Sequence, residues 1–306
     1  KKTVNSWHNI YGLSNIDVVT IARSIDAHIA IDLSGFTARN RFEVLLKKIS
    51  KIQIGWLGYN NSLGTKKIDY LIADKNLIKA EEENLYEEKI LFLPQIWNAL
   101  SKPNIQPFIK EEKDNLIFSY CSFNNFQKMS DDTIDVWSEI LKNSNSQLLL
   151  KNSLVQGTDI IDNLRNKFYQ RGVENKKIII LERTNNIEEH LKLYNKAQIA
   201  LDTFPYPGVT TTYESLVMGV PVLTMKGNNF NSRCGESINI NLGLNNFIAN
   251  NQNDYYDKAI KFYENPYNFE KIGLDLRNHA LSSSLLDVKT FSKHFYDKLY
   301  EIYTSH

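Results

Sequence analysis

The stretch IALDTFPYPGVTTTYESLVM, residues 199–218, decides how this chain folds. It opens with a short apolar run, residues 199–203, of the kind that forms a buried strand. A turn stiffened by proline and glycine follows, and a helix then begins at three threonines. A strand that leads directly into a helix is the building unit of parallel sheets, so the stretch predicts an α/β fold.

The threonines at this helix start are candidate ligands for a diphosphate. The first turn of a helix presents unpaired N–H groups and the positive end of the helix dipole, and the hydroxyls of Thr210, Thr211 and Thr212 add further donors. Glu214 lies about one turn beyond Thr210, where its carboxylate can accept hydrogen bonds from the hydroxyls of a ribose. The alternative is that the threonines only cap the helix and Glu214 is a solvated first-turn acid.

Apolar runs and helical patterns alternate along the rest of the 306-residue chain, which is long enough for two domains. Strands are predicted at residues 27–33, 52–57, 68–73, 89–93, 116–122, 148–151, 177–181, 199–203 and 221–225. Helices are predicted at residues 131–143, 160–171, 187–196, 211–218, 254–264, 268–281 and 287–303. Segment 98–114 holds two prolines and a run of charges, and we expect the boundary between two lobes there.

Composition and missing motifs exclude several classes of function. The 36 basic residues balance 35 acidic ones, so we expect neither nucleic acid nor a membrane as a partner. Cys121 and Cys234 match no metal-ligand spacing and are predicted to be reduced thiols of a cytoplasmic protein. The sequence contains no Asp-x-Asp pair of the kind that holds a metal, no dinucleotide-binding glycine motif and no ATPase loop. We therefore expect no metal and no cofactor.

Two further polar residues lie close to predicted strands. Lys128 ends the loop CSFNNFQK, residues 121–128, from which its ammonium group could reach a phosphate. His190 lies in a predicted helix just before the strand that leads into the threonine turn. Taken singly, each is more often a solvated surface residue, so the pattern leaves both roles open.

Ordered blocks along most of the chain resemble the catalytic region of the O-GlcNAc transferase family, most closely its bacterial and SPINDLY-like members. The blocks are DLSGFT (32–37) with Asn40 and Arg41, QIGWLGY (53–59) with Gly64, IDY (68–70), FNN (123–125) with Lys128, EH (189–190), LDTFP (201–205), TTT (210–212) with ESL (214–216), MGVP (218–221) and SR (232–233). The resemblance implies the GT-B architecture, which has two Rossmann-like lobes with parallel sheets. We accordingly expect a first, acceptor-side lobe at residues 1–105, a nucleotide-sugar-binding lobe at 106–286, and a last helix at 287–306 that packs back towards the first lobe.

The resemblance also implies roles for individual residues. Lys128 would bind the donor diphosphate and stabilise it as the leaving group, and Thr210 and Thr211, with Thr212 beside them, would hold phosphate. Glu214 would hold the ribose. With no metal present, a lysine, hydroxyl groups and a helix N-terminus would have to stabilise the charge that develops on the diphosphate.

Three more residues belong to the implied substrate site. Asn125 and His190 would border the nucleoside, and Gly64 belongs to the segment that borders the active cleft. No residue matches the histidine-containing loop that lines the acceptor side in the family, so the general base is left unassigned. Because that loop and the strands around it normally precede this region, as tetratricopeptide repeats do, we expect an incomplete first lobe that transfers sugar poorly.

The implied activity is metal-independent transfer of a sugar from a nucleotide diphosphate to a Ser or Thr hydroxyl of a protein, with inversion. UDP-GlcNAc is the expected donor, and a protein or peptide is the expected acceptor. Two alternatives stay open: a GDP-fucose-dependent protein O-fucosyltransferase of SPINDLY type, and a nucleotide-sugar-binding module without turnover. A GT-B enzyme that acts on a glycan or lipid is disfavoured, because no basic amphipathic helix marks a membrane face.

Overall fold

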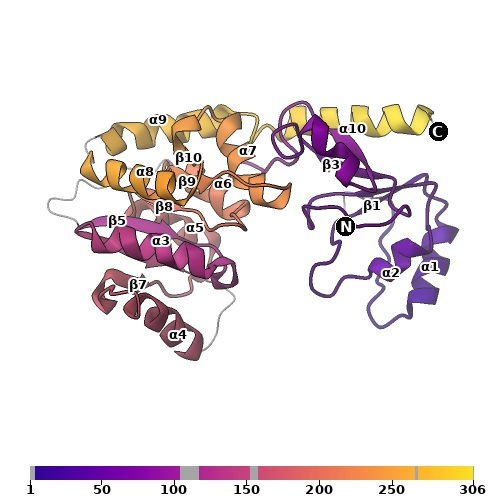
Figure 1. The fold of residues 1–306 in the computed structure, drawn as a ribbon. Coiled ribbons are helices and arrows are strands. Elements are labelled where there is room, and N and C mark those ends of the chain that lie inside the picture. The colour runs from indigo at the N-terminus through magenta and orange to yellow at the C-terminus, as the bar shows by residue number, and fades with distance from the viewer. Residues whose placement is uncertain (1–3, 104–116, 152–157, 266–267, 306) are drawn as a thin grey trace. The chain divides into compact units, whose positions relative to one another are not determined.

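The computed structural model describes residues 4–103, 117–151, 158–265 and 268–305, and it divides into two α/β units (Figure 1). Unit 1 comprises Lys1–Trp97 and Ser292–His306, and unit 2 comprises Asn98–Phe291. The division therefore falls between Trp97 and Asn98, whereas the boundary predicted between residues 105 and 106 lies outside the described residues.

Unit 1 is built on a parallel sheet with the strand order β1-β2-β3-β4. Its elements are α1 (Asn15–Ser24), β1 (Ile29–Asp32), α2 (Phe42–Leu46), β2 (Ile52–Gly55), β3 (Tyr70–Ala73), the 3-10 helix η1 (Ala80–Leu85) and β4 (Lys89–Phe92). Every residue of the two central strands is buried, as expected for apolar runs in a parallel sheet, whereas the edge strand β1 is only half-buried.

The last helix, α10 (Val288–Ser305), belongs to unit 1 from Ser292 onward. The ring of Phe295 lies 4.5 Å from that of Trp56, and the ring of Tyr303 lies 5.0 Å from that of His28. Ile302 is buried on the same helix. Aromatic contacts of this kind hold the end of the chain against the segments that carry β1 and β2.

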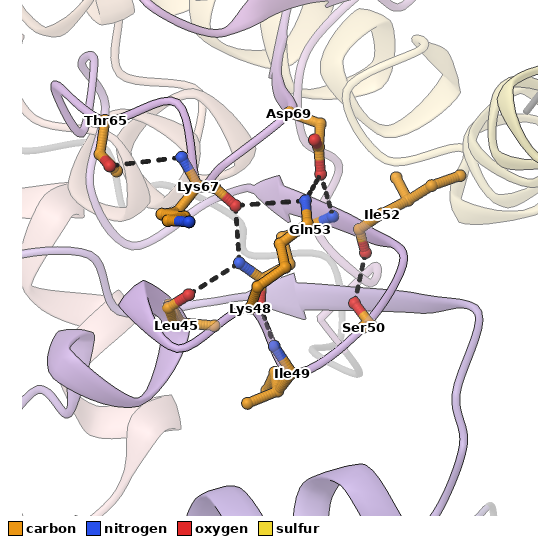
Figure 2. A network of polar contacts seen from close by, with 9 residues as sticks. All are labelled: Leu45, Lys48, Ile49, Ser50, Ile52, Gln53, Thr65, Lys67 and Asp69. Carbon is orange, nitrogen blue, oxygen red and sulfur yellow. Dashed lines mark hydrogen bonds and ion pairs between the residues drawn. The ribbon is translucent and has the colours of Figure 1, made fainter.

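A buried glutamine ties together the loops around β2, as Figure 2 shows. The side chain of Gln53 is 0% exposed, and its amide donates to the carbonyl oxygens of Leu45 at 2.9 Å and Lys67 at 2.7 Å. Its Oε1 accepts from the backbone N–H of Ile49 at 2.9 Å, and its own N–H donates to Asp69 at 2.6 Å. One side chain thus satisfies three backbone groups from the segments that precede and follow β2.

Replacing Gln53 with leucine is expected to destabilise unit 1 by about 3 kcal/mol, because each buried polar group left without a partner costs about 1–3 kcal/mol. Hydrogen-exchange mass spectrometry of unit 1 peptides across a urea series measures this loss. The control is Lys48→Ala, which removes a partly exposed ion pair with Asp69 and a long 3.4 Å hydrogen bond to the carbonyl oxygen of Lys67. That change should cost no more than about 1 kcal/mol, and equal losses in the two variants would contradict the prediction.

Unit 2 is built on a six-stranded parallel sheet with the order β10-β9-β8-β5-β6-β7. The strands are β5 (Phe118–Ser122), β6 (Ser146–Leu150), β7 (Ile178–Ile180), β8 (Ile199–Leu201), β9 (Val222–Met225) and β10 (Ile248–Ala249). The helices are α3 (Asp131–Lys142), α4 (Thr158–Tyr169), α5 (Ile187–Lys192), α6 (Thr210–Val217), α7 (Cys234–Asn241), α8 (Gln252–Glu264) and α9 (Asn268–Ser282), with short 3-10 helices η2 (Phe126–Lys128), η3 (Asn175–Lys177), η4 (Leu193–Lys196), η5 (Asn231–Arg233) and η6 (Asn245–Phe247).

The strand order of unit 2 reverses between β5 and β8. From β5 the chain runs outward through β6 and β7, then returns to β8 on the other side of β5 and continues through β9 and β10. The loops that follow β5 and β8 therefore diverge at the carboxyl edge of the sheet. Ligands of open α/β sheets bind at this kind of reversal.

Among the residues that the structure describes, none of the helices combines the length and the apolar character required to cross a membrane.

Candidate functional site

The loops that leave β5 and β8 are joined by a network of buried side chains. Nδ2 of Asn124, just after β5, donates to Asp202 at 2.9 Å and to Thr203 at 3.0 Å, just after β8. Oδ1 of Asn124 accepts from the hydroxyl of Thr211, in the first turn of α6. The network therefore fixes the start of α6 relative to both loops.

Asp202 organises the turn that enters α6. It is 2% exposed, and its Oδ1 accepts from the backbone N–H groups of Gly208 at 2.7 Å and Thr203 at 3.0 Å. Its Oδ2 accepts from the hydroxyl of Thr224 at 2.9 Å. Burial raises the pKa of Asp202, and the hydrogen bonds from Gly208 and Thr224 act in the opposite direction.

Gly208 lies where the turn meets the helix, in a space too small for a side chain. A Cβ there would come within 2.7 Å of Oδ1 of Asn124 and would also meet the hydroxyl of Thr211. The absence of a Cβ thus permits the close approach of the turn to the start of α6.

The N-terminus of α6 exposes part of the threonine run. Val209, whose side chain has no polar atom, is the N-cap, so the threonines occupy the first turn and the alternative that they cap the helix is wrong. Thr210 is exposed and Thr211 is half-buried. Thr212 is 2% exposed, so its hydroxyl belongs to the interior of unit 2.

Lys128 lies against the turn that precedes this helix start. Its Nζ donates to the carbonyl oxygen of Pro207 at 2.8 Å and lies 4.1 Å from the centre of the Tyr206 ring. Burial lowers the pKa of Lys128, and the charge of Asp202 opposes this fall. The partly buried ammonium group of Lys128 is thereby held next to Pro207, and the chain enters the first turn of α6 three residues later.

His190 and Glu214 form a pair from α5 and α6. Nε2 of His190 lies 3.1 Å from Oε2 of Glu214, and the hydroxyl of Tyr194 donates to the same oxygen at 3.3 Å. The single proton of that hydroxyl is shared with the carbonyl oxygen of Thr211, which lies 3.2 Å from the hydroxyl oxygen. Within the described part of the chain, the hydrogen bonds to the Glu214 carboxylate all go to Oε2.

The other two predicted residues lie apart from this pair. Asn125 is the N-cap of η2, where its side chain accepts from the N–H of Gln127 at 3.1 Å and supports the turn that carries Lys128. Gly64 belongs to unit 1, in the loop between β2 and β3, with the left-handed φ of 65° that favours glycine. The structure thus brings Lys128 to the turn before α6 and His190 to Glu214, and Gly64 is described with unit 1.

The sequence patterns assign no role to four residues that shape the site, namely Asn124, Asp202, Tyr194 and Lys151. Asn124 follows the strand predicted at residues 116–122, and Asp202 is a charged residue within the strand predicted at residues 199–203, one position after the observed end of β8. Polar residues at the carboxyl ends of strands are a signal that could have identified both. Tyr194 and Lys151 carry no such signal, because an aromatic residue in a helix and a lysine at a strand end are both common. In the described ranges, no group of three or more His, Cys, Asp or Glu side chains is arranged to hold a metal ion.

Comparison with known proteins places this geometry in a family. Residues 11–113 and 109–295 match the family described as glycosyl transferase family 41. A protein of Eustoma exaltatum subsp. russellianum, named probable UDP-N-acetylglucosamine–peptide N-acetylglucosaminyltransferase SPINDLY, is 31% identical over 288 residues, which cover 93% of this chain and 31% of that protein. The SEC protein of Arabidopsis thaliana, which carries the same enzyme name, is 25% identical over 97% of this chain and 31% of its own length. The chain spans about a third of the length of these relatives.

Solved structures show the same fold. A Thermobaculum terrenum O-GlcNAc transferase mutant superimposes with a TM-score of 0.89 at 24% identity, over 99% of this chain and 58% of that chain. Anabaena Alr3699/HepE in complex with UDP and glucose gives a TM-score of 0.60 at 13% identity, over 97% and 84% of the two chains. The predicted GT-B fold with two parallel-sheet α/β units is thereby confirmed, as is the resemblance to the O-GlcNAc transferase family. The chain belongs to glycosyl transferase family 41.

Proposed function

We propose that this chain is the catalytic region of a glycosyltransferase that moves GlcNAc from UDP-GlcNAc to a Ser or Thr hydroxyl of a protein, without a metal ion. One observation carries the proposal. A lysine from the β5 loop and the helix α6, with its partly exposed first turn and Glu214, follow the two strands between which the strand order of unit 2 reverses. The enzyme names of the SPINDLY and SEC relatives support the donor and the acceptor.

The chemistry of the proposed reaction requires positive charge where the diphosphate leaves. Lys128 exchanges the carbonyl oxygen of Pro207 for a phosphate oxygen, and the N–H groups of the first turn of α6 donate to the same group. The hydroxyls of Thr210 and Thr211 add donors. Fixed donors in a partly buried site stabilise developing charge without reorganisation at the moment of reaction.

The nucleoside lies on the side of His190 and Glu214 in this proposal. Oε1 of Glu214 accepts hydrogen bonds from the ribose hydroxyls, because Oε2 already has two donors. His190 and Asn125 border the base.

The two free cysteines are buried, which supports the cytoplasm as the compartment of this protein.

A donor panel tests the proposed function. Titration calorimetry with UDP, UDP-GlcNAc, GDP and GDP-fucose measures binding, and mass spectrometry of a peptide pool measures transfer. We expect binding of the uridine nucleotides and the addition of one N-acetylhexosamine to peptides. Preference for GDP-fucose would identify a protein O-fucosyltransferase, binding without transfer would identify a nucleotide-sugar-binding module, and no binding at all would reject the proposal.

Metal independence gives a separate expected result. The dissociation constant of UDP should be the same in EDTA as in Mg²⁺, because Lys128 and the start of α6 carry the interaction with phosphate in place of a cation. Calorimetry under the two conditions measures this. A large loss of affinity in EDTA would show that a metal ion bridges the diphosphate to the protein.

A further inference from the structure

A buried lysine lies behind the His190–Glu214 pair. Lys151 directly follows β6 and is 3% exposed. Its Nζ lies 2.7 Å from Nδ1 of His190 and donates to the hydroxyl of Thr184 at 3.0 Å. A buried ammonium group is costly unless it is hydrogen-bonded, so these two contacts explain how a lysine is retained at this position.

Lys151 and Glu214 together determine which nitrogen of His190 carries the proton. An ammonium group has three donors and no acceptor, so Nδ1 of His190 must accept from Lys151. An imidazole that accepts at Nδ1 carries its proton at Nε2. That proton lies 3.1 Å, measured between the heavy atoms, from Oε2 of Glu214 and is donated to it.

The charges along this row are complementary. Burial lowers the pKa of Lys151, and the carboxylate of Glu214 opposes this fall. The row runs from Thr184 through Lys151 and His190 to Glu214, and each neighbour is a donor facing an acceptor. The four side chains come from loops and helices that follow β6, β7 and β8, so the row fixes three segments at the edge of the sheet.

We propose that Lys151 is a positioning residue of the nucleoside side of the site. It holds His190 in the tautomer with the proton on Nε2, and that proton holds Oε2 of Glu214 so that Oε1 faces the ligand. The ligand-binding part of this inference rests on the proposed function, whereas the tautomer is a property of the free protein.

The tautomer is measured first, without ligand. Nitrogen NMR of the imidazole side chains distinguishes protonated from unprotonated ring nitrogens, and the signals of His190 are assigned by their loss in a His190→Gln variant. In the unaltered chain we expect a protonated Nε2 and an unprotonated Nδ1. A proton on Nδ1 would overturn the proposal whatever happens to the variants.

Two substitutions then test the part played by Lys151. Lys151→Met should lower the share of the Nε2-protonated tautomer, because only the Glu214 carboxylate then selects it, and Lys151→Arg should restore the original share, because a guanidinium is also a donor without acceptors. The control Lys192→Met removes an exposed lysine of α5 that pairs with Glu188, and it should leave His190 unchanged. An unchanged tautomer in Lys151→Met would refute the role of Lys151.

Binding supplies the second readout. Lys151→Met should weaken the binding of UDP and of uridine alike, by about tenfold. The reason is that His190 and Glu214, which Lys151 positions, lie on the nucleoside side of the proposed site. A loss for UDP with no loss for uridine would contradict this placement. If the tautomer is as expected but the unaltered chain binds no nucleotide, then the proposed function fails while the role of Lys151 in the free protein stands.

Discussion

Replacing Lys128 with alanine is expected to weaken UDP binding by about 10- to 150-fold and to leave uridine binding unchanged. A hydrogen bond between a charged lysine and a phosphate contributes about 1.5–3 kcal/mol, which corresponds to that change in Kd. Lys128 lies against Pro207 and Tyr206 at the turn that enters α6, where a diphosphate would be bound. The contacts of its Nζ in the described part of the chain are with a carbonyl oxygen and an aromatic ring, and a phosphate can replace the first of them.

Calorimetry with UDP and uridine on the same preparations measures the two affinities. The control is Lys176→Ala, which removes an exposed lysine of η3 that pairs with Glu174 and should change neither affinity. Hydrogen exchange of the peptide that contains α6 verifies that Lys128→Ala retains the fold. Equal losses for UDP and uridine would show that Lys128 acts on the structure of the site and does not contact the diphosphate.

Replacing Asp202 with alanine is expected to destabilise unit 2 by about 3–5 kcal/mol. The carboxylate accepts from two backbone N–H groups, those of Thr203 and Gly208, in buried hydrogen bonds. Each buried donor left without an acceptor costs about 1–3 kcal/mol, and the side chains of Asn124 and Thr224 lose a partner as well. A urea series followed by hydrogen-exchange mass spectrometry of unit 2 peptides measures the loss.

Asp202→Asn is the matched control. The bonds from Thr203, Gly208 and Asn124 all go to Oδ1, and an asparagine oxygen can keep them. Its amide group can then donate to the hydroxyl oxygen of Thr224. Because burial already opposes the charge of Asp202, we expect Asp202→Asn to cost about 1 kcal/mol at most. A loss as large as that of Asp202→Ala would show that the negative charge itself, through its electrostatic attraction to Lys128, stabilises the turn.

Local patterns in the sequence determined most of the elements and several of the candidate site residues. Largely apolar runs of six and five residues predict β2 and β9 within one or two residues, and the spacing of Ile134, Trp137 and Ile140 predicts α3. A threonine run after a strand and a proline-rich turn predicts a helix start at the edge of the sheet. Each of these signals is contained in a few consecutive residues.

Elements with weak local signals were missed. The helix α7 has the sequence CGESININ, in which apolar residues do not recur at helical spacing, and β10 has only two residues. Both are held by packing against β9. The helix α1 had a signal that went unused, since Ser14 and Asp17 form a capping box at its start.

Only the tertiary structure decided which of the candidate residues meet. Asn124 and Asp202 are 78 residues apart in the chain and hydrogen-bond because β5 and β8 are neighbours, a pairing that no local pattern contains. Thr212 is buried whereas Thr210 is exposed, although both belong to one run. Lys151 is buried in contact with His190, although 39 residues separate them in the chain. The periodicity of apolar residues indicates which face of each segment is buried. Strand order and side-chain networks depend instead on contacts between segments that are distant in the chain, and such contacts exist only once the sheet has formed.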